Sequence, residues 1–138
     1  MKTVLGLIVL LSATSACSGS DSSGTSTLPT STTLVTESFS GTVAVGASDF
    51  HTFSVSTGGA INVTLTAASP PPTIYMGIGV GTPSASTCAL LTNGSVAAPA
   101  GVSAQLSGTL SPGTYCVSVY DIGNQTTPVT YAVTVTHY

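Results

Sequence analysis

Residues 129–136 read Val-Thr-Tyr-Ala-Val-Thr-Val-Thr, and this alternation decides the fold class. Successive side chains of a β-strand point to opposite faces, so an apolar residue at every second position indicates a strand with one buried and one solvated face. The same pattern recurs at 61–67, 102–107 and 114–119. These segments therefore predict strands that are each buried on one side only.

Less regular apolar runs predict four further strands, at 37–45, 49–56, 73–80 and 88–92. Clusters of Gly, Pro and Asn separate the strands and predict turns, as at 93–94. No window has the spacing of an amphipathic helix. About eight strands at short intervals predict an all-β chain folded as an antiparallel β-sandwich, because a lone sheet would leave its apolar face in water.

Glycine occupies every second position of residues 77–81, which read Gly-Ile-Gly-Val-Gly. The segment is not a phosphate-binding loop, since Pro83 follows almost at once and no helix is predicted after it. The alternation instead predicts a strand whose outer face is closely covered by another segment.

Charge is almost absent from the chain. Lys2 is the only basic residue, and the acidic residues are Asp21, Glu37, Asp49 and Asp121. Proteins bind nucleic acids mainly through cationic contacts to phosphate, so this composition argues against a nucleic-acid partner and against a polybasic attraction to anionic lipid. Solubility depends on Ser and Thr hydroxyls instead, and the chain is expected to respond weakly to salt.

The N-terminus has the organisation of an export signal, with a basic residue, a short apolar run and then small residues. Residues 14–17 (Thr-Ser-Ala-Cys) resemble the bacterial lipobox, with Thr14 where that motif usually carries Leu. The resemblance predicts a signal peptide at 1–16 and a lipid, such as palmitate, on Cys17. Ser18 then favours sorting to the outer membrane or surface of a bacterium. Ordinary secretion with a free cysteine remains the alternative.

The rest of the chain divides into a tether and one domain. Residues 17–35 are rich in Ser, Thr and Gly and predict a disordered tether, whereas residues 36–138 are long enough to bury a core. If Cys17 is lipidated, Cys88 and Cys116 remain as a pair. In an oxidising compartment they are expected to form a disulfide worth about 3.5 kcal/mol in the chain-entropy model. The alternative is two buried free thiols.

Four stretches, within 37–55, 58–65, 110–119 and 131–135, together resemble the bacterial pre-peptidase C-terminal domain. The most specific part is the turn at 112–115 (Pro-Gly-Thr-Tyr), which leads into a strand. The resemblance implies a jelly-roll-like sandwich and a non-catalytic role. Members often carry acidic residues in the strand after the Gly-Gly segment. The corresponding strand here has none, so neither a calcium site nor any other site residue is carried over.

Candidate catalytic and metal-binding residues are few. Asp49 and His51 share one face of a strand and could in principle belong to a Ser-His-Asp triad, but no Gly-x-Ser-x-Gly segment supports one. His137 is expected at an edge or frayed position. Cys88 and Cys116 have no neighbouring His at zinc-ligand spacing, and four acids are too few for a strong calcium site. We therefore expect no enzymatic activity, no cofactor and no metal site.

Tyr75, Tyr120 and Tyr138 have the opposite parity to the apolar residues of their strands, so their rings are expected to face outward. Such rings form stacking platforms in sugar-binding sandwiches. The sequence therefore predicts a non-catalytic envelope lipoprotein, held on a membrane by its N-terminal lipid, with a domain that contacts an unidentified protein or glycan. The alternative is a carbohydrate-binding module that uses the three tyrosines.

Overall fold

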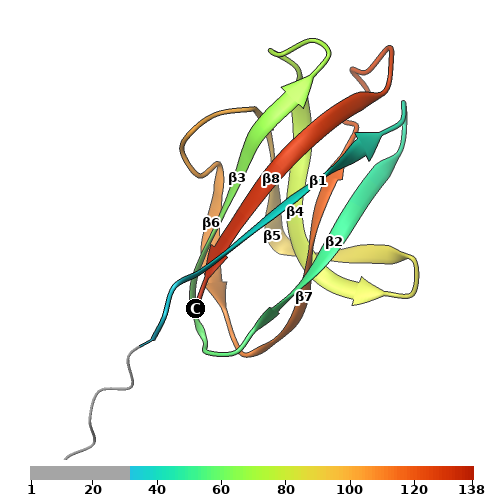
Figure 1. Cartoon of the computed structure of the whole chain (residues 1–138). Helices are drawn as coiled ribbons and strands as arrows, with labels where there is room; N and C mark the ends of the chain where they lie inside the picture. The colour runs from blue at the N-terminus through green and yellow to red at the C-terminus, as the bar shows by residue number, and fades with distance from the viewer. Residues whose placement is uncertain (1–31) are drawn as a thin grey trace, which may run out of the picture. The chain divides into compact units, whose positions relative to one another are not determined.

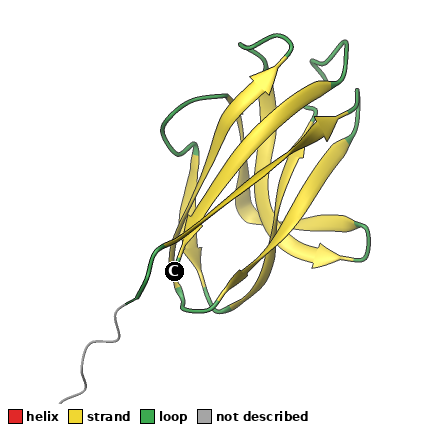
Figure 2. Ribbon diagram, viewed as in Figure 1, coloured by secondary structure: helices red, strands yellow, loops and turns green. Residues whose placement is uncertain are grey.

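The structure is a computed structural model and describes residues 32–138. Its strands are β1 (Val35–Val43), β2 (Ser48–Val55), β3 (Gly59–Ser69), β4 (Tyr75–Ser84), β5 (Thr87–Pro99), β6 (Leu106–Leu110), β7 (Gly113–Tyr120) and β8 (Val129–His137). Figure 2 shows strands and loops alone in the described part. No helix there could cross a membrane. The predicted signal peptide, Cys17 and most of the predicted tether lie outside the described residues.

The strands form two four-stranded antiparallel sheets, which confirms the predicted β-sandwich. One sheet, here the β1 sheet, has the order β1-β8-β3-β6, and the other, the β2 sheet, has the order β2-β7-β4-β5 (Figure 1). The pairs are nested: β1 pairs with β8, β2 with β7, β3 with β6 and β4 with β5. This nesting within two packed sheets is the arrangement of a jelly roll.

The core lies between the sheets and consists of the alternating apolar residues that predicted the strands. Val133 and Val135 of β8, Leu65 of β3 and Ile78 of β4 are completely or almost completely buried. Their neighbours along each strand point outward. Alternation is what the pleat of a half-buried strand requires, and it accounts for the success of the period-two prediction.

The β4–β5 hairpin bends back over the outer face of its own sheet. Pairing is regular up to Gly79 and Ser95, then shifts, and resumes between Gly81 and Leu90. We call residues 81–90 the arm; Figure 1 shows this end of the hairpin turning away from the remaining strands. A Cβ on Gly79 would meet Leu90, and one on Gly81 would meet the backbone of Ala89. The prediction that the glycine strand is covered closely is confirmed.

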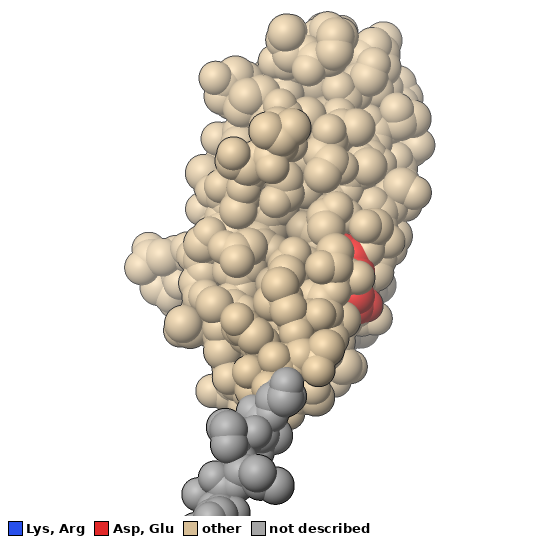
Figure 3. All heavy atoms as spheres, turned by 60° about the vertical axis from the view of Figure 1, so that its left-hand side comes forward, with Lys and Arg blue, Asp and Glu red and all other residues tan. Residues whose placement is uncertain are grey.

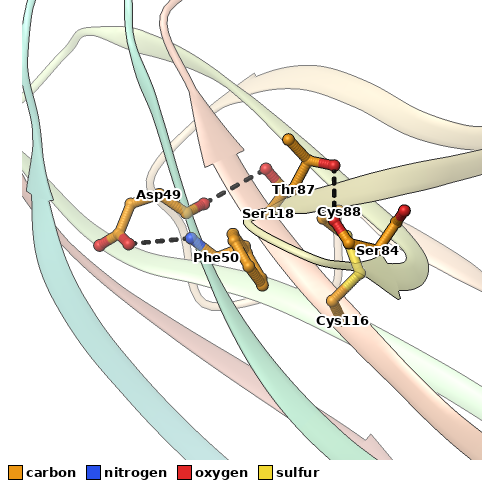
Figure 4. Close-up of a disulfide and its surroundings, with 7 residues drawn as sticks. All are labelled: Asp49, Phe50, Ser84, Thr87, Cys88, Cys116 and Ser118. Atoms are coloured by element: carbon orange, nitrogen blue, oxygen red, sulfur yellow. Dashed lines mark hydrogen bonds between the residues drawn. A yellow bond between two sulfur atoms is a disulfide. The ribbon is translucent and has the colours of Figure 1, made fainter.

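A disulfide between Cys88 and Cys116 fastens the arm to β7, as predicted from the cysteine count. The two Cα atoms are 5.9 Å apart, and Cys116 is fully buried although it points to the outer face of the sheet. Figure 4 shows the bond beside Phe50 of β2, whose ring lies on the same side, while the carboxylate of Asp49 points away.

The predicted strand at 102–107 is wrong over most of its length. Residues 100–105 form a loop, Val102 is fully exposed, and β6 begins only at Leu106. The side chain of Gln105 takes the place of the missing strand. Its Oε1 accepts a hydrogen bond from Leu65 N at 2.7 Å, and its Nε2 donates to Leu65 O at 3.3 Å. One amide therefore satisfies a backbone segment that would otherwise pair with a longer β6.

The predicted turn at Asn93-Gly94 is also wrong. Both residues lie inside β5, at the irregularity where the arm begins. Asn93 has a φ of 58°, a left-handed conformation that asparagine tolerates better than most residues. The signal for a left-handed residue was therefore correct, but here it bends a strand instead of ending one.

Candidate functional site

Four of the described chain's acidic and histidine side chains gather where β1 and β2 form one open edge of the sandwich. Tyr131 Oη donates to Asp49 Oδ2 at 2.8 Å and lies 2.9 Å from His51 Nε2. Because the hydroxyl proton is committed to Asp49, the His51 Nε2 is the donor in the second bond. The result is a chain of hydrogen bonds from His51 through Tyr131 to Asp49, and the ring of His51 also stacks on Phe39 with centroids 5.0 Å apart.

Burial and the carboxylate both act on Tyr131. Desolvation raises the pKa of its hydroxyl well above the usual value of about 10, and the hydrogen bond and negative charge of Asp49 raise the pKa further. The hydroxyl is therefore a fixed donor at neutral pH. Within the described residues, no other hydroxyl is bonded to His51, so the geometry is that of a cross-strand support and lacks the nucleophile of a triad.

The second pair at this edge corrects the expectation for His137. Its ring is almost fully buried: Nε2 lies 3.0 Å from Glu37 Oε1, and Nδ1 lies 3.2 Å from the carbonyl oxygen of Tyr138. The ring also packs against Phe53, at a centroid distance of 5.4 Å. His137 therefore joins β8 to β1 and β2 instead of fraying. Across the described residues, no three His, Cys, Asp or Glu side chains are close enough together to hold a metal ion.

The outer face of the β2 sheet holds the exposed aromatic side chains. Tyr120 lies directly opposite Gly77, and its ring atoms occupy the space that a Cβ on Gly77 would need. Tyr75 is two residues from Gly77 on the same face and is 52% exposed. The structure thus brings Tyr75 and Tyr120 together. It does not bring Tyr138 to them, because that ring lies against Gly59 of the β1 sheet.

Phe50 is the residue of this face that sequence reasoning missed. It lies directly opposite Ser118 in β7, so its ring is on the outer side with Ser118 and Tyr120. The available signal was its parity, which is opposite to that of the buried Phe53 and Val55 on the same strand. We call Phe50, Tyr75 and Tyr120 the aromatic row. Leu90 of the arm lies beside it, over Gly79.

The loop after β7 holds one end of this face in place. Asp121 Oδ2 accepts a hydrogen bond from Gly46 N at 2.8 Å, and its Oδ1 accepts from Gly123 N at 2.8 Å. The Gly46 bond is the largest cause that lowers the pKa of Asp121; bonds from Gly123, Gln125 and Asn124 act in the same direction, against a small effect of desolvation. Asn124 Nδ2 in turn donates to Tyr75 O at 3.0 Å, which links the loop to the start of β4.

A groove of about 230 Å³ lies at the opposite open edge, between β5 and β6. Ile61 and Leu106 line it together with Leu91, and polar residues such as Asn93 lie at its rim. The groove is lined largely by side chains of the core.

Uncharged surface surrounds all of these features. Figure 3 shows a face on which acidic atoms occupy one small area and no basic atom is visible. The outer face of the β1 sheet carries mainly hydroxyls, such as Ser38 and Thr134, whose oxygen atoms are 3.4 Å apart. Only the β2 sheet therefore presents aromatic rings on its outer face.

Comparison with known proteins adds no relative. A scan against protein-family models gives no match for this chain, and a search of curated proteins gives none either.

Proposed function

We propose that this chain is a non-catalytic bacterial envelope lipoprotein, anchored through a lipid on Cys17, whose sandwich contacts another component of the envelope. The observation that carries the binding role is the outer face of the β2 sheet. There Tyr75 and Tyr120 lie together on a glycine strand, next to an arm that a disulfide holds in position. The resemblance of residues 37–135 to the pre-peptidase C-terminal domain, an accessory and non-catalytic module, supports the same reading.

The anchor is tested by metabolic labelling with a fatty acid. The wild-type chain is expected to take up the label and the Cys17→Ser variant to lose it, because the thiol is the attachment atom. A variant with Ser15→Ala, which leaves the cysteine and Ala16 in place, serves as the matched control and should label normally. Label that persists in Cys17→Ser, or is missing from the wild type, would end the lipoprotein proposal.

A second candidate is a carbohydrate-binding module, and the pair Tyr75 and Tyr120 favours it. The mature chain would be applied to a panel of glycans, together with Tyr120→Ala and with Tyr138→Ala as a control on the other sheet. Binding that is lost in the first variant and kept in the second supports this candidate. If the wild type binds no glycan on the panel, the candidate fails while the anchor proposal is unaffected.

A further inference from the structure

The aromatic row is regular because the strand register makes it so. Phe50 of β2 is opposite Ser118 of β7. Tyr120 is two residues farther along β7 and is opposite Gly77 of β4, and Tyr75 is two residues farther in the same direction. Each ring is therefore one strand across and two residues along from the previous one. Diagonal neighbours of this kind are about 7–8 Å apart, so the row spans roughly 15 Å on a straight line.

The glycine strand sets the height and orientation of the central ring. Three ring atoms of Tyr120 fill the position of a Cβ on Gly77, so the ring lies across the backbone of β4 instead of standing up from the sheet. One of its faces is then against the sheet and the other is turned outward. Gly79 is covered by Leu90, which forms a wall beside the row and not on it.

No free charge borders the row. Both oxygens of the nearest carboxylate, Asp121, accept backbone hydrogen bonds, and the described residues contain no Lys or Arg. An anionic polymer would find no cation here, and a cationic ligand would find no unpaired carboxylate. The row is also narrow, whereas a stable protein–protein interface buries about 800 Å² on each partner. An extended neutral chain fits this shape better than a globular surface does.

We propose that the aromatic row is a track for an extended, uncharged polysaccharide, with the C–H faces of successive sugar rings stacked on Phe50, Tyr120 and Tyr75. This inference rests on the binding role proposed for the outer face of the β2 sheet. It goes beyond that role by assigning Phe50, by giving the ligand class and by fixing the path of the chain across β2, β7 and β4. Aromatic faces carry partial negative charge and attract such C–H groups.

Calorimetry with neutral oligosaccharides of increasing length tests the track. Probes are the disaccharide to hexasaccharide series of β-1,4-glucan, β-1,3-glucan and chitin, added to the mature chain. Affinity is expected to rise with length until the row is spanned. Tyr120→Ala should weaken binding at every length, by roughly threefold to tenfold. Phe50→Leu, which keeps an apolar side chain and the fold, should abolish the gain from the longer probes, as should Tyr75→Ala.

Two further variants separate position from chemistry. Gly77→Ala keeps every aromatic residue but displaces the Tyr120 ring, so it should weaken binding about as much as Tyr120→Ala. Tyr138→Ala, on the other sheet, should bind like the wild type. If Tyr120→Ala loses binding but Phe50→Leu keeps the full length dependence, the binding face stands and the track is wrong. If the wild type binds none of the three series, the track is also wrong.

Discussion

Tyr131 combines a structural and a titrating role in one hydroxyl. It points into the sandwich from β8, donates to Asp49 and accepts from His51, and so connects β8 with both polar residues of β2. From the sequence, the parity of Tyr131 predicted its burial correctly. Its two partners could not be predicted, because β2 and β8 are not neighbours in either sheet and their contact depends on how the sheets stack.

The raised pKa of Tyr131 predicts a loss of stability in alkali. The folded chain holds this proton more tightly than the unfolded chain, so the stability it provides is complete below about pH 10 and is lost as the pH rises above that value. Urea denaturation at about pH 8 and about pH 11 should give a smaller decrease in the free energy of unfolding for Tyr131→Phe than for the wild type. Equal decreases would contradict the prediction.

Gly41 is predicted to be intolerant of a side chain. A Cβ at this position would clash with the carboxylate of Asp49 and the hydroxyl of Tyr131. Gly41→Ala is therefore expected to lower the free energy of unfolding by about 1–3 kcal/mol, the usual cost of overpacking. Gly108→Ala is the matched control, since a Cβ there meets only a methyl of Ile61 at 3.9 Å. Similar denaturation midpoints for both variants would refute this account.

At the scale of elements, β6 is the strand that the sequence predicted least well. The alternation at 102–107 is genuine, yet only residues from Leu106 onward pair with β3. A side-chain amide that imitates a strand partner leaves no periodic signal, so Gln105 could not be recognised. The arm was more predictable, because a glycine at every second position has few explanations other than close cover.

Gln105 is expected to contribute measurable stability through the backbone of β3. In Gln105→Ala, both the N–H and the C=O of Leu65 lose a partner, and the free energy of unfolding should fall by about 1–3 kcal/mol. Ser103→Ala, in the same exposed loop, should have almost no effect. Hydrogen exchange gives a second measurement: the amide of Leu65 should exchange faster in Gln105→Ala. Unchanged protection would contradict the role assigned to the side chain.

The whole molecule is a sandwich with almost no charge, and this is where the sequence was most informative. Period two predicted the class and the number of strands, because one face of each strand is buried. The aromatic row was only partly predictable: Tyr75 and Tyr120 were found by parity, but Phe50 and the separation of Tyr138 depend on which strands are neighbours. Strand order is set by the packing of the complete chain and not by any local pattern.

Stability should be nearly independent of ionic strength. The carboxylates of Glu37 and Asp49 have partners close by, and no Lys or Arg in the described residues adds longer-range terms for salt to screen. Between about 0.01 M and about 0.15 M sodium chloride, the melting temperature at neutral pH is expected to change by less than about 2 °C. A larger shift would mean that electrostatic terms contribute more than this surface suggests.

The nested pairing has a consequence for the order of events in folding. β1 and β8 are the first and last strands, and they pair along nine residues, from Val35 opposite His137 to Val43 opposite Val129. Closing that pair brings together positions almost the whole domain apart, and such distant pairings make folding slow. The hydrophobic inner face of β8 is the last to be synthesised. A ribosome-bound or partly exported chain therefore keeps β1 without its partner until the final strand is available.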